Sequence, residues 1–381
     1  MSGVEFYRHA LGAEEAESIA LTLRSVFLTL GPRTAEFERR FAEYLEVEHV
    51  IGTNSCSAGL LIALAAFGIG PGDEVITTPM TFVATATAIL HLGATPIFAD
   101  IEPETGLIDP LEIERRLSPR TRAILPVHLY GQMADMRAIR EIARRHDLFV
   151  IEDAAHAVES ERDGVRPGQL GDAAVFSFYA TKNLTSGDGG AVAVHSSEIA
   201  ERLRRLRNHG ITKDAATRYG QHYRHWDMLE LGYKAAMNDL DAALLLPQID
   251  KVEARREQRG RLVERYRENL AGQPQIEQIR PVGKSAHHLY TVQVPAELRD
   301  ALLSGLGQRG IGCAVNYRSL HTLSYFAERL RAERDDYPRA ALFGERTLTL
   351  PLWPDLPLER VDRASQALLD AITDTSRESG L

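Results

Sequence analysis

The sequence predicts an α/β protein in which helices cover both faces of a mainly parallel sheet, followed by a smaller α+β domain. The chain has 381 residues, which is more than one small hydrophobic core accommodates. Between about residues 50 and 195, short strand-like runs alternate with helical stretches, a pattern typical of parallel sheets. Several of these runs are apolar and β-branched without alternation, which indicates strands buried on both faces.

The elements of the first part follow from this alternation. Six runs have the composition of strands, namely residues 74–77, 95–99, 122–127, 148–152, 173–177 and 190–194. Helical stretches are expected at residues 58–68, 82–92, 110–117 and 135–146, with a basic helix at 199–208 after them. An earlier helix is expected over residues 33–46. Its residues Phe37, Phe41 and Leu45 fall on one apolar stripe.

The second part begins after residues 206–226, a polar segment rich in His and Arg that lacks clear periodicity. Residues 238–269 have the pattern of one or two long helices, with a break expected at Pro247. The remaining elements are strands 289–294 and 312–316 and helices 297–309 and 358–372. We therefore expect a large domain at residues 1–250 and a small domain at residues 251–381. The first 25 or so residues belong to the large domain in this division, but packing of this segment against the small domain is compatible with the sequence.

The composition excludes several classes of partner. The formal net charge is −9, so binding to nucleic acid or to an anionic membrane is not expected. Cys56 and Cys313 lack the spacing of metal ligands and are expected as free thiols in a reducing compartment, with no metal site. The first residues lack the apolar core of a signal peptide, and no run reaches the roughly 20 apolar residues that a membrane helix needs. A cytoplasmic location is the resulting expectation.

Lys182 is the first candidate for chemistry. It follows the run 173–177, and the carboxyl ends of strands are where α/β sheets bind ligands. Its neighbours Thr181 and Asn183 are uncharged, and a glycine-rich run follows at 187–190. A desolvated amine loses its proton easily and is suited to bonding with a carbonyl carbon. An ordinary surface lysine in a loop is the alternative interpretation.

Asp153 is the second candidate, because it directly follows the run 148–152 and lies 29 residues before Lys182. A carboxylate at a strand end is suited to pairing with the protonated ring nitrogen of a cofactor. His156 follows about one helical turn later, where its ring is able to stack on a cofactor ring. The alternatives are a helix N-cap for Asp153 and a buried, hydrogen-bonded histidine for His156.

Small and hydroxylated residues at 52–59 precede a helix, and the free N–H groups of a helix N-terminus bind phosphate. Ser177 offers another hydroxyl, and Phe82 is placed to lie on a ring face. The alternatives are simple N-capping and, for Phe82, a core aromatic on a helix. Taken together, these features supply what pyridoxal phosphate (PLP) requires, namely an amine, a carboxylate, a phosphate cup and stacking rings.

In this order, the segments resemble sugar-nucleotide aminotransferases of the DegT/DnrJ/StrS type. Further matching segments are residues 27–32, 70–76, 126–131, 207–210, 231–234 and 350–354. The resemblance implies the PLP-dependent transferase fold type I, with a seven-stranded sheet sandwiched by helices. It also implies a homodimer with shared active sites.

The same resemblance assigns roles to residues. The implied cofactor-binding residues are Ser57, Ala58, Phe82, Asp153, His156, Ser177 and Lys182. Lys182 holds PLP and then moves protons as the freed amine, and Asp153 pairs with the pyridine nitrogen. Phe82 and His156 lie on the two ring faces. The two serines and Ala58 bind the phosphate.

In such enzymes a residue of the partner subunit also reaches the phosphate. Lys234 is the natural candidate, but Asn238 stands close by in the sequence, so both remain open. Residues 316–321 depart from the usual His-Tyr-x-Pro-x-His of the family. Tyr317 and His321 of this segment are the expected substrate-binding residues.

The resemblance implies transfer of an amino group from glutamate to a keto-sugar linked to UDP or dTDP. The run 183–190 is compact, and His156 stands where other members have Gln. Both features favour C4 of a 4-keto-6-deoxyhexose or a 4-keto pentose. The alternatives are amination at C3, and a non-catalytic binding or regulatory protein on the same scaffold. Dehydratases of this fold have His at the lysine position, so Lys182 argues against that reaction.

Overall fold

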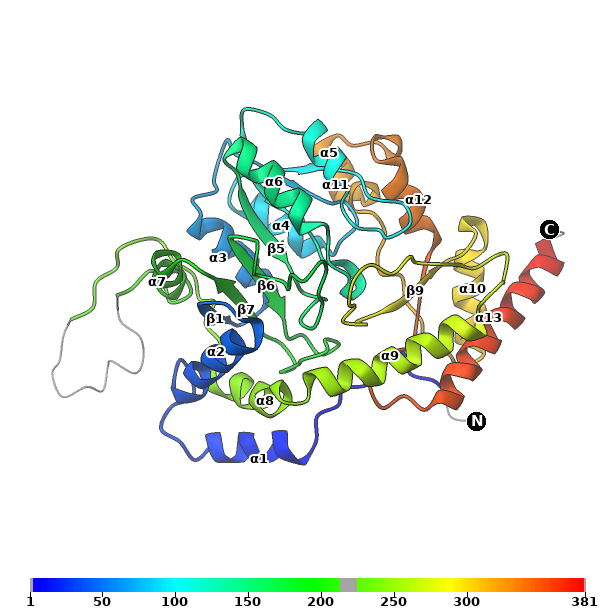
Figure 1. Ribbon diagram of the computed structural model, residues 1–381, viewed down its shortest axis with the longest axis horizontal. Coiled ribbons are helices and arrows are strands. Elements are labelled where there is room, and N and C mark those ends of the chain that lie inside the picture. Colours follow the sequence, from blue (N-terminus) through cyan, green and yellow to red (C-terminus); the bar gives the residue numbers. More distant parts are fainter. Residues whose placement is uncertain (1–2, 213–224, 380–381) are drawn as a thin grey trace.

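The computed structural model describes residues 3–212 and 225–379, and its largest feature is a seven-stranded sheet (Figure 1). The strand order is β1 (His49–Thr53), β7 (Gly190–Val194), β6 (Ala173–Ser177), β5 (Phe149–Asp153), β4 (Thr121–Leu125), β2 (Glu74–Thr77) and β3 (Thr95–Phe98). Strand β7 is antiparallel to β1 and β6, whereas the other neighbouring pairs are parallel. The predicted mainly parallel sheet is confirmed. Residues 213–224, part of the segment without periodicity, lie outside the described residues.

Burial explains why six strands were predictable and β1 was not. Every residue of β2, β6 and β7 is buried, so their centres are apolar without the alternation of a half-exposed strand, and the polar residues Glu74, Thr77 and Ser177 stand only at strand ends. Strand β1 contains His49 and Gly52, which weaken its apolar pattern. Its position depends on antiparallel pairing with β7, which a local pattern does not reveal.

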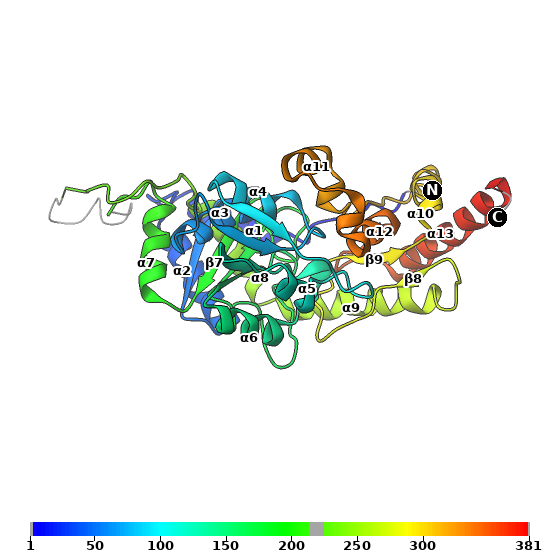
Figure 2. The same cartoon turned by 90° about the horizontal axis from the view of Figure 1, so that it is seen from above.

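Helices cover both faces of this sheet (Figures 1 and 2). They include α2 (Pro32–Leu45), α3 (Cys56–Ala66), α4 (Val83–His91), α5 (Pro110–Arg115), α6 (Met136–His146), α7 (Ser197–Leu206) and α8 (Asp239–Ile249). Neighbouring residues of β6 point to opposite faces. Val175 belongs to a core with Leu60 of α3, whereas the Phe176 ring lies against the Phe41 ring of α2, with centroids 5.3 Å apart. The apolar stripe predicted for α2 is fully buried.

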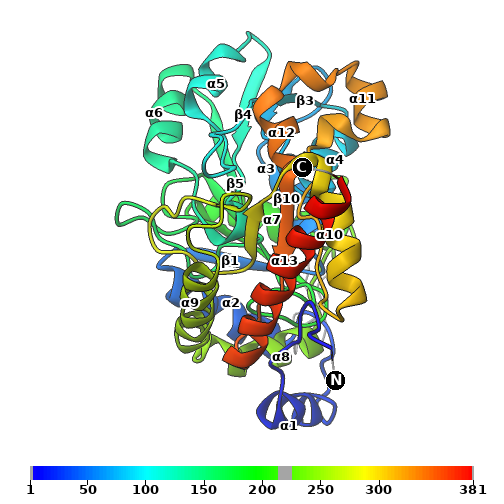
Figure 3. The same ribbon diagram turned by 90° about the vertical axis from the view of Figure 1, so that its right-hand side faces the viewer.

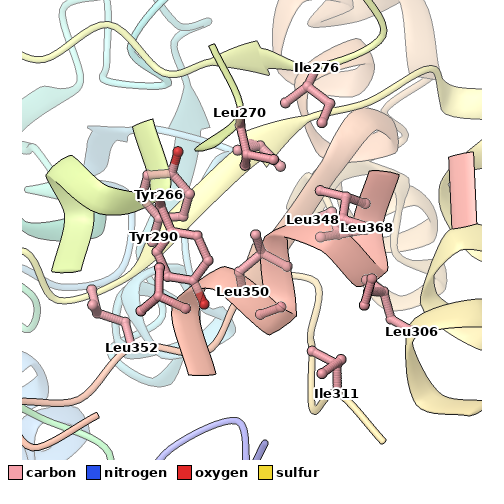
Figure 4. Close-up of a cluster of buried hydrophobic side chains, with 14 of the residues drawn as sticks. Tyr266, Leu270, Ile276, Tyr290, Leu306, Ile311, Leu348, Leu350, Leu352 and Leu368 are labelled. Atoms are coloured by element: carbon pink, nitrogen blue, oxygen red, sulfur yellow. The ribbon is translucent and has the colours of Figure 1, made fainter. Parts of the chain in front are cut away.

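A second, antiparallel sheet has the strand order β10 (Thr347–Leu350), β9 (Tyr290–Gln293) and β8 (Glu277–Gln278). The helices around it are α9 (Val252–Asn269), α10 (Ala296–Gln308), α11 (Ser324–Leu330), α12 (Pro338–Arg346) and α13 (Leu358–Ser379), and Figure 3 shows α10 and α13 beside β10. In its core Tyr266 stacks on Tyr290, with ring centroids 4.6 Å apart, near Leu348 and Leu350 (Figure 4). This apolar cluster joins α9, the small sheet and α13.

Two expectations for the second part need correction. The predicted strand at 312–316 is wrong, since only Ala314 bridges to Thr349 before the chain leaves the sheet. Its apolar pattern reflects packing beside β10, and the strand that completes the sheet is β10 itself. The long helical segment is two helices, but the break falls at 250–251, after Pro247, which lies inside α8.

The N-terminal segment contacts both parts of the molecule. Val4 pairs with Ile311 and is buried in the core of the small sheet, whereas α1 (Ala13–Thr22) packs against α8. Figure 1 shows α9 running on from α8 into the second part. We propose residues 1–250 and 251–381 as the two domains, because each range holds its own sheet. None of the helices in the described ranges is long and apolar enough to cross a membrane.

Candidate active site

A cavity of about 640 Å³ lies at the carboxyl ends of β5 and β6 and at the N-termini of α3 and α4. Its large-domain lining includes Ser57, Phe82, Asp153, His156, Ser177 and Lys182. Its other walls include Phe6, Tyr7, His288, Asn316 and Tyr317. The structure therefore brings together most of the residues singled out from the sequence, at the edge of the sheet where they were expected.

Lys182 lies in the loop after β6 and is only partly exposed. Burial lowers the pKa of its amine from 10.5 to about 8, although Cys56 and Asp153 act in the opposite direction. A larger fraction of this amine is thus unprotonated near neutral pH than for an ordinary lysine. Its place in the cavity excludes the interpretation of a surface lysine.

Asp153 ends β5 and is 5% exposed. Thr85 Oγ1 donates to Oδ2 at 2.7 Å, and the backbone N–H of Ala155 donates to Oδ1 at 3.1 Å. Burial raises the pKa of this carboxyl, and the two hydrogen bonds partly offset the effect. Turns and not a helix follow Asp153, so the N-cap interpretation is wrong. The carboxylate is anchored but keeps oxygen lone pairs for a partner in the cavity.

Two rings, Phe82 and His156, line the cavity from different elements. Phe82 is 54% exposed at the N-terminus of α4, so its interpretation as a core aromatic is wrong. His156 is buried, and its Nδ1 accepts a hydrogen bond from the Tyr130 backbone N–H at 3.3 Å. Tyr317 lies near both rings, with centroid distances of 5.9 Å to Phe82 and 6.1 Å to His156.

The start of α3 combines helix capping with an open face. Ser55 caps the helix, because its Oγ accepts the Ala58 backbone N–H at 3.1 Å. The Ala58 amide is therefore already engaged, and Ala58 is not part of the cavity lining, whereas Ser57 and Ser177 are. The first N–H groups of a helix have no partner within it, so this wall attracts an anion.

Besides Ala58, three predicted residues lie outside the cavity lining of their own chain. Lys234 is exposed, and its carbonyl oxygen accepts from Asn54 at 3.2 Å. Asn238 caps α8 through the Asp241 backbone N–H at 2.9 Å. His321 is buried away from the cavity, where its ring nitrogens contact Ser319 Oγ and the Arg334 carbonyl oxygen. The geometry gives His321 no contact with a ligand in the cavity, because its hydrogen-bonding groups are used within the protein.

A buried network behind Lys182 was not predicted. Arg259 of α9 donates to Glu159 at 2.5 Å, and both side chains are 1% exposed. Asn183, next to Lys182, donates to Glu159 at 3.0 Å and to the Ala286 carbonyl at 2.9 Å. Its Oδ1 lies 3.2 Å from Nδ1 of His288 in the cavity wall. This network fixes the lysine loop against the second domain, and its members are too far apart in sequence to form a motif.

The residues present fit PLP. A partly desolvated amine, a buried carboxylate and a helix N-terminus line one cavity, between aromatic and imidazole rings that match a flat cofactor. Among the described residues, no group of three or more His, Cys, Asp or Glu side chains is arranged to hold a metal ion. An α/β fold of this kind with these groups in one cavity defines a PLP-dependent enzyme.

Comparison with known proteins identifies the family. The model of the DegT/DnrJ/EryC1/StrS aminotransferase family matches residues 9–369, and the chain belongs to this family. It is 40% identical to the spore coat polysaccharide biosynthesis protein SpsC of Bacillus subtilis, over 95% of each chain. The chain is thus an aminotransferase, and PLP is its cofactor.

Solved structures agree in fold over the whole chain. The sugar aminotransferase Spr1654 of Streptococcus pneumoniae, described as putative and solved in a pyridoxamine-phosphate form, gives a TM-score of 0.92 at 30% identity, covering 97% of this chain and 99% of that one. DesV of S. venezuelae gives a TM-score of 0.90 at 37% identity, covering 97% and 98%. The fold type I expectation is therefore confirmed.

Proposed function

We propose that the enzyme transfers an amino group from glutamate to C4 of a keto-sugar carried by UDP or dTDP. The observation that carries this proposal is the presence of both Lys182 and Asp153 in the lining of a single cavity of about 640 Å³. The family of the chain supports amino-group transfer, and its relatives include sugar aminotransferases by name. SpsC, named for polysaccharide biosynthesis, supports a role in making an amino sugar for a polysaccharide.

In this proposal Lys182 bonds to the cofactor between turnovers and moves protons during them. When bound, PLP supplies an electron-accepting ring on which amino groups are exchanged. Asp153 keeps the ring nitrogen protonated, because its buried carboxylate favours a positive partner. Ser57 and Ser177, with the start of α3, bind the phosphate, and Phe82 and His156 hold the ring faces. The pKa of about 8 for Lys182 suits an amine that gives and takes protons near neutral pH.

We also propose a homodimer whose subunits share active sites. Exposed apolar residues gather in two segments, with Leu23 and Val26 60% and 84% exposed and Leu229 and Leu231 60% and 80% exposed. Such surfaces are typical of protein interfaces. Lys234 follows the second segment and is free to reach the phosphate of the partner's cavity. This arrangement accounts for its absence from the cavity of its own chain. Asn238 is the weaker candidate, because capping α8 uses its side chain.

The choice of C4 is supported by the compact loop 183–190 and by His156. The loop turns at Gly187 and Gly189, both with positive φ, and Asp188 between them lines the cavity. The enzyme is also proposed to work in the cytoplasm, because Cys56 and Cys313 are free thiols, as is typical of a reducing compartment.

Product analysis tests the proposal. Purified enzyme is incubated with ¹⁵N-glutamate and a panel of UDP- and dTDP-linked 4-keto and 3-keto sugars, and products are identified by mass spectrometry and NMR. The expected result is ¹⁵N at C4 of a 4-keto-6-deoxyhexose or a 4-keto pentose. Nitrogen at C3 would contradict the position, and PLP-loaded enzyme that leaves every sugar unlabelled would contradict the substrate class.

A further inference from the structure

The hydrogen bonds around His156 determine which of its ring nitrogens carries a proton. The backbone N–H of Tyr130 donates to Nδ1 at 3.3 Å, and a backbone amide is a donor only, so Nδ1 is unprotonated. Burial and the nearby charge of Lys182 hold the pKa of His156 well below its usual range, so the ring is neutral. The single ring proton therefore lies on Nε2.

Tyr317 accepts the hydrogen bond from that proton. His156 Nε2 and Tyr317 Oη lie 3.2 Å apart, so with this tautomer the imidazole donates and the phenol oxygen accepts. Burial raises the pKa of Tyr317, so the phenol also keeps its own hydrogen. The Asn316 side chain also hydrogen-bonds this phenol and lowers its pKa, so the amide donates to the phenol oxygen. The oxygen thus accepts from both neighbours, no hydrogen bond of the described residues uses the phenol hydrogen, and Tyr317 lines the cavity. The hydroxyl is thus a donor available to a ligand.

Asn316, the preceding residue, supplies the complementary group. Its Oδ1 is buried and has no hydrogen-bond partner among the described residues, and the residue lines the same cavity. An unpaired buried acceptor is costly unless a ligand or a water completes it. A phenol donor beside an amide acceptor matches one ligand group in particular, a hydroxyl, which both accepts and donates a hydrogen bond.

We propose that Tyr317 and Asn316 together bind a hydroxyl group of the sugar, on the carbon next to the keto carbon. The pair lies beside His156, which shares the cavity with Lys182, so the group it binds is close to the reacting carbon. In a 4-keto-6-deoxyhexose this group is the C3 hydroxyl. The inference rests on the proposed function, because it requires a sugar substrate, and it adds the feature by which the substrate is selected.

The test combines a protein variant with a substrate analogue. Binding of dTDP-4-keto-6-deoxyglucose and of its 3-deoxy analogue is measured by equilibrium dialysis, together with kcat/KM, for the wild-type holoenzyme, Tyr317→Phe and Asn316→Ala. Tyr325→Phe is the matched control, because it removes the same atom from a tyrosine that is 59% exposed on α11, outside the cavity lining. The wild type and the control are expected to prefer the hydroxylated sugar by about 10- to 100-fold. Tyr317→Phe and Asn316→Ala are expected to lose most of that preference.

Other outcomes overturn the inference. Equal binding of both sugars by the wild type, or an equal loss for both sugars in Tyr317→Phe, would show that the hydroxyl is not recognised by this pair. A changed absorption spectrum of sugar-free Tyr317→Phe holoenzyme would show that the phenol faces the cofactor instead. If the wild type binds neither sugar although glutamate converts its cofactor spectrum, the proposed substrate class itself fails, and the inference fails with it.

Discussion

Replacing Lys182 with Met is expected to stabilise the cofactor-free protein near neutral pH. The amine has a pKa of about 8 in the folded chain because burial disfavours its charged form, against 10.5 when exposed. At about 1.4 kcal/mol per pH unit, the difference corresponds to about 3 kcal/mol of stability that the buried charge removes. Methionine keeps most of the volume without the charge, so Lys182→Met regains up to that amount.

The pH dependence distinguishes this cause from a change in packing. Below pH 8 both the folded and unfolded wild type bind the proton, so the full destabilisation is present. Between pH 8 and 10.5 the unfolded chain binds more protons than the folded chain, so the wild type gains stability as pH rises. The advantage of Lys182→Met should therefore be largest at pH 7 and shrink toward zero by pH 10.5.

Urea denaturation of both cofactor-free proteins, followed by circular dichroism at several pH values, measures this difference at equal protein concentration. Lys251→Met is the matched control, because hydrogen bonding to Glu14 raises the pKa of Lys251, with further help from Glu15. That change should reduce stability, the opposite of the effect at residue 182, because the exposed pair with Glu14 contributes little but the buried Glu15 carboxylate also loses a partner. A Lys182→Met protein that is no more stable at pH 7, or whose advantage is the same at pH 7 and pH 10, would refute the reasoning.

The remaining predictions concern the network, the ring carboxylate and the shared site. Arg259→Met leaves the Glu159 carboxylate buried without its charged partner, with only the Asn183 amide still donating to it, and should cost about 3–5 kcal/mol in thermal or urea denaturation; an unchanged stability would contradict the assigned pairing. Asp153→Ala should weaken PLP binding in equilibrium dialysis without loss of helical circular dichroism, and undiminished affinity would argue against its role. When Lys182→Ala and Lys234→Ala subunits are mixed, about half of the dimers contain one subunit of each kind, and one of the two sites in such a dimer is intact. The mixture should therefore regain about a quarter of wild-type activity. No recovery would exclude the contact of Lys234 with the phosphate site of the other subunit.

The sequence predicted those parts of the fold that depend on local pattern. Short β-rich runs, several of them apolar without alternation, identified six strands, and because the carboxyl ends of parallel strands share one edge, Asp153 and Ser177 were correctly expected near Lys182. Strand β1 was missed because only its pairing with β7 defines it. The strand at 312–316 was wrong because an apolar run beside a sheet has the same composition as a strand within it.

The predictable part of the site consists of residues that follow strands or begin helices of the large domain. Phe6, Tyr7 and His288 reach the cavity from distant segments, and no spacing in the sequence indicates their approach. Arg259 lies in a highly charged helix, where nothing local distinguishes a buried guanidinium from its exposed neighbours. His321 shows the reverse case, in which a residue in a suggestive segment is used for internal hydrogen bonds.

The most direct measurement of the central claim is the site of attachment of the cofactor. Holoenzyme is reduced with borohydride, which fixes PLP to the lysine that carries it, and peptides are then analysed by mass spectrometry. The sequence contains five lysines, and the account predicts a pyridoxyl group on Lys182 alone. A pyridoxyl group on Lys234, Lys251 or another lysine, or PLP-loaded protein that carries none after reduction, would contradict it.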